Sequence, residues 1–128
     1  MTLDEFALAH SKLIEQYQLI EYHLEGLFGI AGSGDFEELT RRVENDTMGE
    51  LIRKVKFIFH ENKIDLLDNN DFESLEVIRN DRNYWCHQCY LDIKAKENIE
   101  KITNIKNDYD LVYGMNQKLR EVFKTIKG

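Results

Sequence analysis

The chain has no proline in 128 residues, and this absence constrains its fold more than any other single feature. Proline interrupts helices because it lacks a backbone N–H and its ring clashes with the preceding turn. A chain without it suits long helices joined by short connections. Apolar residues also recur in three- and four-residue steps along most of the sequence, which is the spacing of one helix face. The sequence therefore predicts an all-α fold, an up-and-down bundle of four to five helices.

The helix boundaries follow from the apolar periodicity and from capping signals. Two helices are expected to begin at capping boxes, one from Thr47 to Glu50 and one from Asn70 to Glu73. A glycine-containing loop at 32–34 ends the first helix, and no strand is expected. The expected helical segments cover, approximately, residues 4–30, 36–43, 47–62, 70–90 and 96–126.

Length and charge limit the kind of protein this can be. Residues 1–128 are enough for one hydrophobic core and too few for two, so a single domain is expected. With 24 acidic and 17 basic residues the net charge is −7, which argues against a protein that grips nucleic acid through a broad basic face. Two cysteines, and no signal-like or membrane-length apolar run, predict a cytoplasmic protein without membrane contact.

Residues 82–89, Arg-Asn-Tyr-Trp-Cys-His-Gln-Cys, carry the most chemistry. Arginine binds phosphate oxygens through paired hydrogen bonds, and imidazole titrates near neutral pH. Arg82 and His87 are five residues apart, so they lie about 140° from each other around an ideal helix. One helix alone does not aim both at one phosphate. A site that uses both is easier to build when a second copy approaches by two-fold symmetry, so a homodimer is expected.

The stretch from Arg82 to His87 resembles the arginine, polar residue, three others, histidine pattern of the HEPN superfamily. The whole chain also looks like a HEPN domain, because members are small helical bundles and are commonly dimeric. Active members are metal-independent ribonucleases of toxin–antitoxin, abortive-infection and other antiviral systems. The resemblance thus implies an endoribonuclease that acts on RNA and needs no metal and no cofactor.

Family roles can be carried to individual residues. The resemblance implies that Arg82 binds and stabilises the scissile phosphate, that His87 handles protons, and that Asn83 orders the pair. Attack of a 2′-hydroxyl on the adjacent phosphorus would leave a 2′,3′-cyclic phosphate and a 5′-hydroxyl. Arg79 lies one turn before Asn83 and could add a phosphate contact, although the family pattern does not require it.

The sequence departs from some family members after the histidine. Some HEPN toxins carry a tyrosine two residues beyond it, which a partner antitoxin modifies with AMP. Cys89 occupies that position here, and Tyr90 follows it. Control by a cognate antitoxin or a defence partner protein therefore stays open.

Two other interpretations stay open as well. The superfamily includes non-catalytic domains, and the acidity of the chain is compatible with a binding or regulatory module. Cys86 and Cys89, with His87 between them, could also indicate zinc or redox chemistry. A structural zinc site wants four ligands and the sequence has no second such pair, so zinc could only bridge a dimer.

Overall fold

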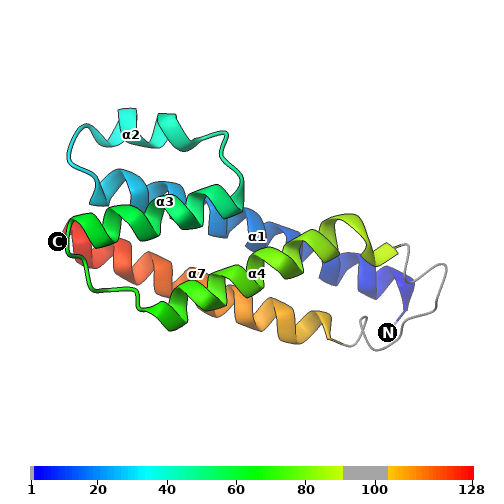
Figure 1. The fold of residues 1–128 in the computed structure, drawn as a ribbon. Coiled ribbons are helices and arrows are strands. Elements are labelled where there is room, and N and C mark those ends of the chain that lie inside the picture. The colour runs from blue at the N-terminus through cyan, green and yellow to red at the C-terminus, as the bar shows by residue number, and fades with distance from the viewer. Residues whose placement is uncertain (1, 91–103) are drawn as a thin grey trace.

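The computed structural model describes residues 2–90 and 104–128. Over these two ranges the chain forms helices and no strand (Figure 1). The helices are α1 (Leu3–Ala31), α2 (Phe36–Val43), α3 (Met48–Glu61), α4 (Asn69–His87) and α7 (Ile105–Lys127). The all-α helical bundle predicted from the sequence is confirmed.

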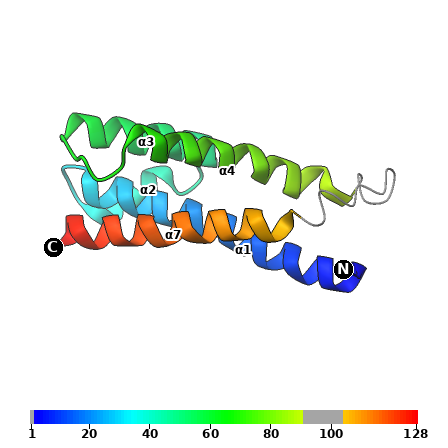
Figure 2. The same ribbon diagram turned by 90° about the horizontal axis from the view of Figure 1, so that it is seen from below.

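The longest helix, α1, is the centre of the arrangement and lies beside α7 along much of its length (Figures 1 and 2). These two helices run in the same direction, whereas α4 runs back toward the N-terminal end of α1. The C-terminal part of α4, which carries the motif, consequently lies near the start of α1. Among the described helices, none is long and apolar enough to cross a membrane.

The core forms where the apolar stripes of the helices meet. Residues of α1 that recur at helical spacing are almost fully buried: Phe6, Leu13, Tyr17, Ile20, Leu24 and Leu27. Facing residues of α7 are buried in the same cluster: Ile105, Val112, Met115, Leu119 and Val122. Each fully buried aliphatic or aromatic side chain contributes about 1.5–3 kcal/mol to folding relative to an exposed one, so this seam dominates the stability of the bundle.

The sequence predicts Asn70 as the N-cap of α4, and this prediction is wrong. The N-cap is Asp68, two residues earlier. Oδ1 of Asp68 accepts a hydrogen bond from the backbone N–H of Asp71 at 2.8 Å, and Oδ2 of Asp71 accepts one from the backbone N–H of Asp68 at 2.9 Å. Asp71 also pairs with Lys118 of α7 at 2.5 Å. Aspartate caps a helix as well as asparagine does, and here the tertiary contact favours the aspartate pair.

The other helix boundaries differ in how well they agree with the sequence. Thr47 caps α3 by accepting from the backbone N–H of Glu50 at 3.3 Å, as its sequence spacing predicts. The helix that carries the motif ends at His87 with Gln88 as its C-cap, three residues before the expected end. For the last helix, the expected start near residue 96 lies outside the described residues, and α7 is described from Ile105.

The short helix α2 sits close against the end of α1, and a glycine makes this approach possible. A Cβ atom at Gly29 would lie 2.6 Å from Cγ2 of Thr40 and 2.8 Å from Cδ2 of Phe36. Those distances are too short for any side chain, so only glycine fits. Since α2 buries only Leu39 and Val43, the contact at Gly29 is a substantial part of what holds it in place.

Candidate functional site

The motif residues lie along the solvent-facing side of α4. Arg79 and Arg82 are half-buried, whereas Asn83 and His87 are exposed. Exposed residues recur along α4 at three- and four-residue spacing and continue just past its end: Val77, Asn80, Asn83, His87 and Tyr90. We call this set the α4 stripe. Its two apolar members, Val77 and Tyr90, are 50% and 39% exposed.

Arg82 is tied to α1 by an ion pair. Its Nε lies 3.1 Å from Oε1 of Glu21, and the two side chains are 33% and 26% exposed. A guanidinium has five N–H donors, and this contact occupies one of them. The remaining donors can still contact a phosphate. The carboxylate of Glu21, however, partly neutralises the arginine.

Trp85 anchors the motif to both neighbouring helices. Its indole N–H donates to Oδ2 of Asp108 on α7 at 2.6 Å, and its backbone carbonyl lies 2.7 Å from Nε2 of His10 on α1. A carbonyl can only accept, so the proton of the His10 ring is on Nε2. Because Trp85 is almost fully buried, the backbone that carries Arg82 and His87 is held firmly at this point.

Tyr17 lies beneath the motif and is also almost fully buried. Its hydroxyl has no hydrogen-bond partner within residues 2–90 and 104–128. Burial raises the pKa of Tyr17 far above its usual range, and the carboxylates of Asp108 and Asp81 raise it further, against the opposing effect of Arg82. The phenol therefore stays protonated at neutral pH and cannot serve as a base there.

Arg79 and Asn83 have different surroundings. Nε of Arg79 lies 2.8 Å from Oε2 of Glu76 on the same helix. A Cβ atom added at Gly49 would lie only 3.1 Å from Cδ of Arg79. The aliphatic part of the Arg79 side chain therefore packs against α3. Asn83 points to solvent, and in the described part of the chain its side chain makes no hydrogen bond. The two residues are therefore not brought together by any contact.

The histidine of the motif lies apart from the arginine. His87 is exposed in the last turn of α4, and no hydrogen bond or ion pair joins it to Arg82 in the chain as far as it is described. The angular separation expected from the sequence, about 140°, is thus kept by a regular helix. A single copy presents the two groups to different sides.

The two cysteines differ in environment. Cys86 is exposed, while Cys89 is buried and its Sγ lies 3.2 Å from the backbone oxygen of Trp85. Neither forms a disulfide within the described ranges. In the two described ranges, no group of three or more His, Cys, Asp or Glu side chains is arranged to hold a metal ion.

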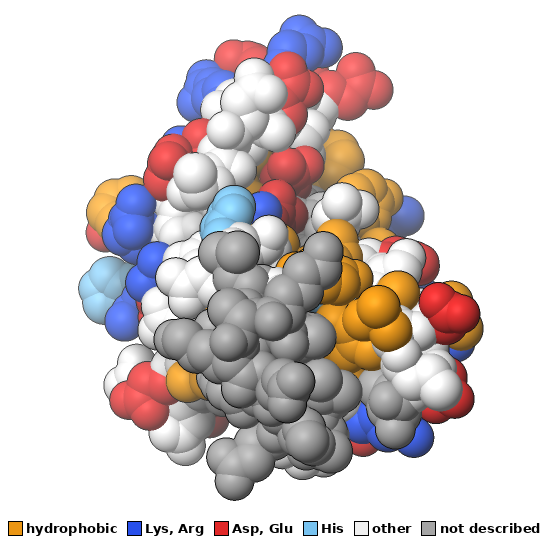
Figure 3. All heavy atoms as spheres, turned by 90° about the vertical axis from the view of Figure 1, so that its right-hand side faces the viewer, with side chains coloured by type: hydrophobic (Ala, Val, Ile, Leu, Met, Phe, Trp, Pro, Cys, Tyr) orange, Lys and Arg blue, Asp and Glu red, His pale blue; other side chains and the backbone are white. Residues whose placement is uncertain are grey.

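Figure 3 shows the end of the bundle near which α4 stops and α7 begins. Acidic and basic side chains alternate over this face, and apolar side chains gather at one side of it. Among the residues coloured by type on this face, no broad basic surface is visible.

Reasoning from the sequence missed Glu21 and Tyr17. Both lie on α1, far from the motif in sequence, and no spacing rule connects them to Arg82. The available signal was indirect, since the apolar stripe of α1 places Tyr17 on its buried face. Which residue of α4 faces it depends on how the two helices are aligned.

No family model, no curated protein and no solved structure matches this chain.

Proposed function

We propose that the chain is a metal-independent endoribonuclease of the HEPN type, acting as a toxin or in antiviral defence, with a composite active site at a homodimer interface. The proposal rests mainly on one observation. Arg82, Asn83 and His87 are solvent-accessible on a helix whose backbone is fixed at Trp85 by contacts to α1 and α7. Catalysis by proximity and orientation requires reactive side chains that the substrate can reach and that a rigid backbone holds in place.

Each residue then has a defined task. The guanidinium of Arg82 binds the scissile phosphate and stabilises charge that develops on its oxygens. His87 removes the proton of the 2′-hydroxyl, and a proton returns to the leaving 5′-oxygen. Asn83 hydrogen-bonds the RNA backbone between them. The products are a 2′,3′-cyclic phosphate and a 5′-hydroxyl, and cationic arginine with imidazole can supply this chemistry without a metal.

A second copy of the chain can bring Arg82 and His87 together, although they diverge on one helix. In an antiparallel pair of α4 helices centred between residues 84 and 85, position 82 of one copy faces position 87 of the other. The α4 stripe offers its exposed polar members Asn80, Asn83 and His87 to this pairing. Such a pairing would bring Arg82 of one copy toward His87 of the other.

The catalytic residues are tested by incubating purified protein with RNA. Arg82→Ala and His87→Ala should each lower cleavage by about 100-fold or more, while added EDTA should have no effect. Arg53→Ala and His60→Ala are matched controls, because these exposed side chains of α3 lie outside the motif. Circular dichroism checks that each variant is folded. Cleavage that persists unchanged in both motif variants would overturn the proposal.

The composite site has a sharper test. When Arg82→Ala and His87→Ala proteins are mixed and allowed to exchange subunits, each heterodimer regains one site with both groups intact. With half of the dimers mixed and one of two sites restored, about a quarter of wild-type activity should return. A site formed within one chain would recover none.

A second candidate is a non-catalytic binding or regulatory module. The ion pair between Arg82 and Glu21 favours it, because it neutralises the arginine that catalysis requires. In this case RNA stays intact at high protein concentration, expression is harmless to the cell, and Arg82→Ala changes neither result.

A further inference from the structure

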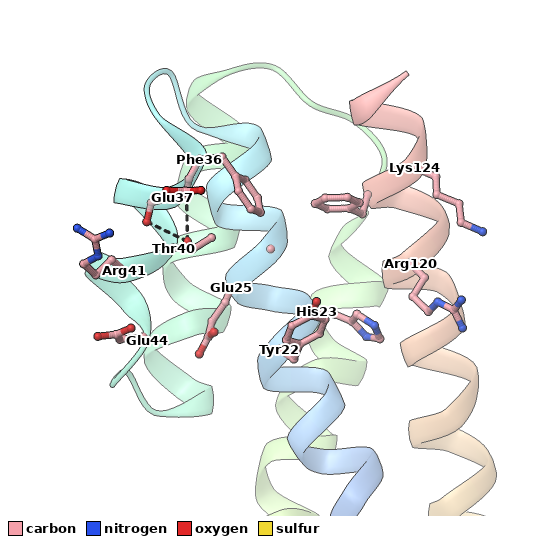
Figure 4. Close-up of a pocket in the computed structure, with 12 residues that line it drawn as sticks. Tyr22, His23, Glu25, Phe36, Glu37, Thr40, Arg41, Glu44, Arg120 and Lys124 are labelled. Carbon is pink, nitrogen blue, oxygen red and sulfur yellow. Dashed lines mark hydrogen bonds between the residues drawn. The ribbon is translucent and has the colours of Figure 1, made fainter.

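A pocket of about 580 Å³ opens between the C-terminal half of α1, the helix α2 and the C-terminal half of α7 (Figure 4). Arg79, Arg82, Asn83 and His87 do not line it. Pockets that bind small molecules measure about 300–1,000 Å³, so this one is large enough for a metabolite. Its walls carry aromatic rings, a histidine and charged side chains of both signs.

Aromatic rings form the first wall. Phe36 of α2 and Phe123 of α7 meet edge to face with their centroids 6.2 Å apart. Tyr22 lies on α1 beside His23 at 5.7 Å. Tyr22 is 68% exposed and Phe36 is 41% exposed, although large aromatic side chains usually bury their rings. These accessible rings offer faces on which a flat ring can stack.

His23 supplies an oriented hydrogen-bond acceptor. The buried amide of Asn116 donates through Nδ2 to the backbone oxygen of Gln16 at 2.9 Å. This fixes Oδ1 of Asn116 toward Nδ1 of His23 at 2.9 Å, so Nδ1 must carry the proton. In the neutral ring Nε2 is then a bare acceptor, and no protein group of the described ranges donates to it.

Charged side chains lie on both sides of the pocket: Arg120 and Lys124 are on α7, and Arg41 is on α2, on the same side as Glu44 (Figure 4). Arg120 and Lys124 are one turn apart on α7, and Nζ of Lys124 lies 3.5 Å from Oε1 of Glu121. Among the described residues, Arg120 has no ion-pair partner. Across the opening, Glu25 of α1 and Glu44 after α2 line the other side. Burial raises the pKa of Glu25, and the nearby carboxylates of Glu21 and Glu44 raise it further. The α7 side of the pocket therefore offers cations to an anion, and Glu25 offers a carboxylate to N–H donors.

We propose that this pocket binds a nucleoside monophosphate. The phosphate lies on Arg120 and Lys124, and a ribose hydroxyl donates to Nε2 of His23. The base stacks on the aromatic wall, and its amino group donates to the carboxylate of Glu25. This site is separate from the motif on α4 and does not depend on the function proposed for it.

Isothermal titration of the full chain with AMP tests the proposal. The wild type should bind AMP saturably, and Arg120→Gln should weaken binding by about ten-fold or more. Lys106→Gln is the matched control, because it removes one positive charge from an exposed position of α7 outside the pocket and should leave affinity unchanged. Tyr22→Ala gives a second variant with little risk to folding, since this ring is mostly exposed, and it should also weaken binding.

Related ligands separate the parts of the proposal. Adenosine and inorganic phosphate should each bind at least about ten-fold more weakly than AMP, because each makes only half of the contacts. The proposal is overturned if AMP shows no saturable binding or if Arg120→Gln binds AMP as the wild type does.

Discussion

Nε of Arg82 lies 3.1 Å from Oε1 of Glu21, and this ion pair joins the motif helix α4 to α1. Both side chains are partly exposed, so solvent screens the pair and it adds about 0–1 kcal/mol to stability. Its main effect is on the charge available to a ligand. The arginine that the proposed chemistry requires is held in place and partly neutralised by the same carboxylate.

Glu21→Gln should therefore increase RNA affinity severalfold while changing the free energy of unfolding by less than about 1 kcal/mol. Removing the carboxylate frees the guanidinium and lowers repulsion of phosphate. Fluorescence anisotropy with labelled RNA at fixed salt measures this. Glu15→Gln makes the same change of charge at an exposed position of α1 and is the control. Equal gains in both variants would mean that only net charge matters.

Tyr17→Phe should leave the protein as stable as the wild type or more stable. The ring is almost fully buried, and its hydroxyl has no partner in the described part of the chain. A buried polar group without a hydrogen bond costs about 1–3 kcal/mol, so removing the oxygen relieves a cost while the ring still packs. Urea denaturation of the variant and the wild type measures the difference. A loss of more than about 1 kcal/mol would show that the hydroxyl is bonded.

Most of the fold was predictable because the signals are local. The buried residues of α1 follow its three- and four-residue spacing, and Thr47 caps α3 through the backbone of Glu50 three positions later. The start of α4 was predicted wrongly because it depends on a contact that is distant in sequence. Asp68 and Asn70 are both good caps, and the choice depends on the ion pair between Asp71 and Lys118, which lies far away in sequence.

Part of the candidate site could likewise be predicted from the sequence, and part of it could not. The divergence of Arg82 and His87 follows from helix geometry and could be calculated from the sequence. Glu21 could not be identified as the partner of Arg82, because that contact depends on the alignment of α1 against α4. The pocket at His23 was missed entirely, since its walls come from three helices and no short motif marks them.

Gly29→Ala should destabilise the protein, while Gly114→Ala should stabilise it. Both glycines lie within helices, where alanine is favoured by about 1 kcal/mol. At Gly114 nothing lies within 4 Å of the new Cβ, so the substitution should stabilise the protein by about this amount. At Gly29 the Cβ would be 2.6 Å from Cγ2 of Thr40, and overpacking of this kind costs about 1–3 kcal/mol. Thermal unfolding measures both, and a gain of stability in Gly29→Ala would show that α2 is loosely held.

His23 should make the protein less stable in mild acid. Burial lowers the pKa of His23 below its ordinary value of 6.5, and the charge of Arg120 lowers it further, although the hydrogen bond to Asn116 opposes this. Above pH 6.5 both states are neutral and His23 adds no pH dependence. Below it the unfolded chain takes up the proton first, so the free energy of unfolding falls until the folded pKa is passed. Urea unfolding at about pH 7.5 and 5.5 measures this. The free energy of unfolding should fall less between the two pH values for His23→Gln than for the wild type or for the exposed control His60→Gln. Equal losses in all three proteins would mean that His23 is not the group responsible.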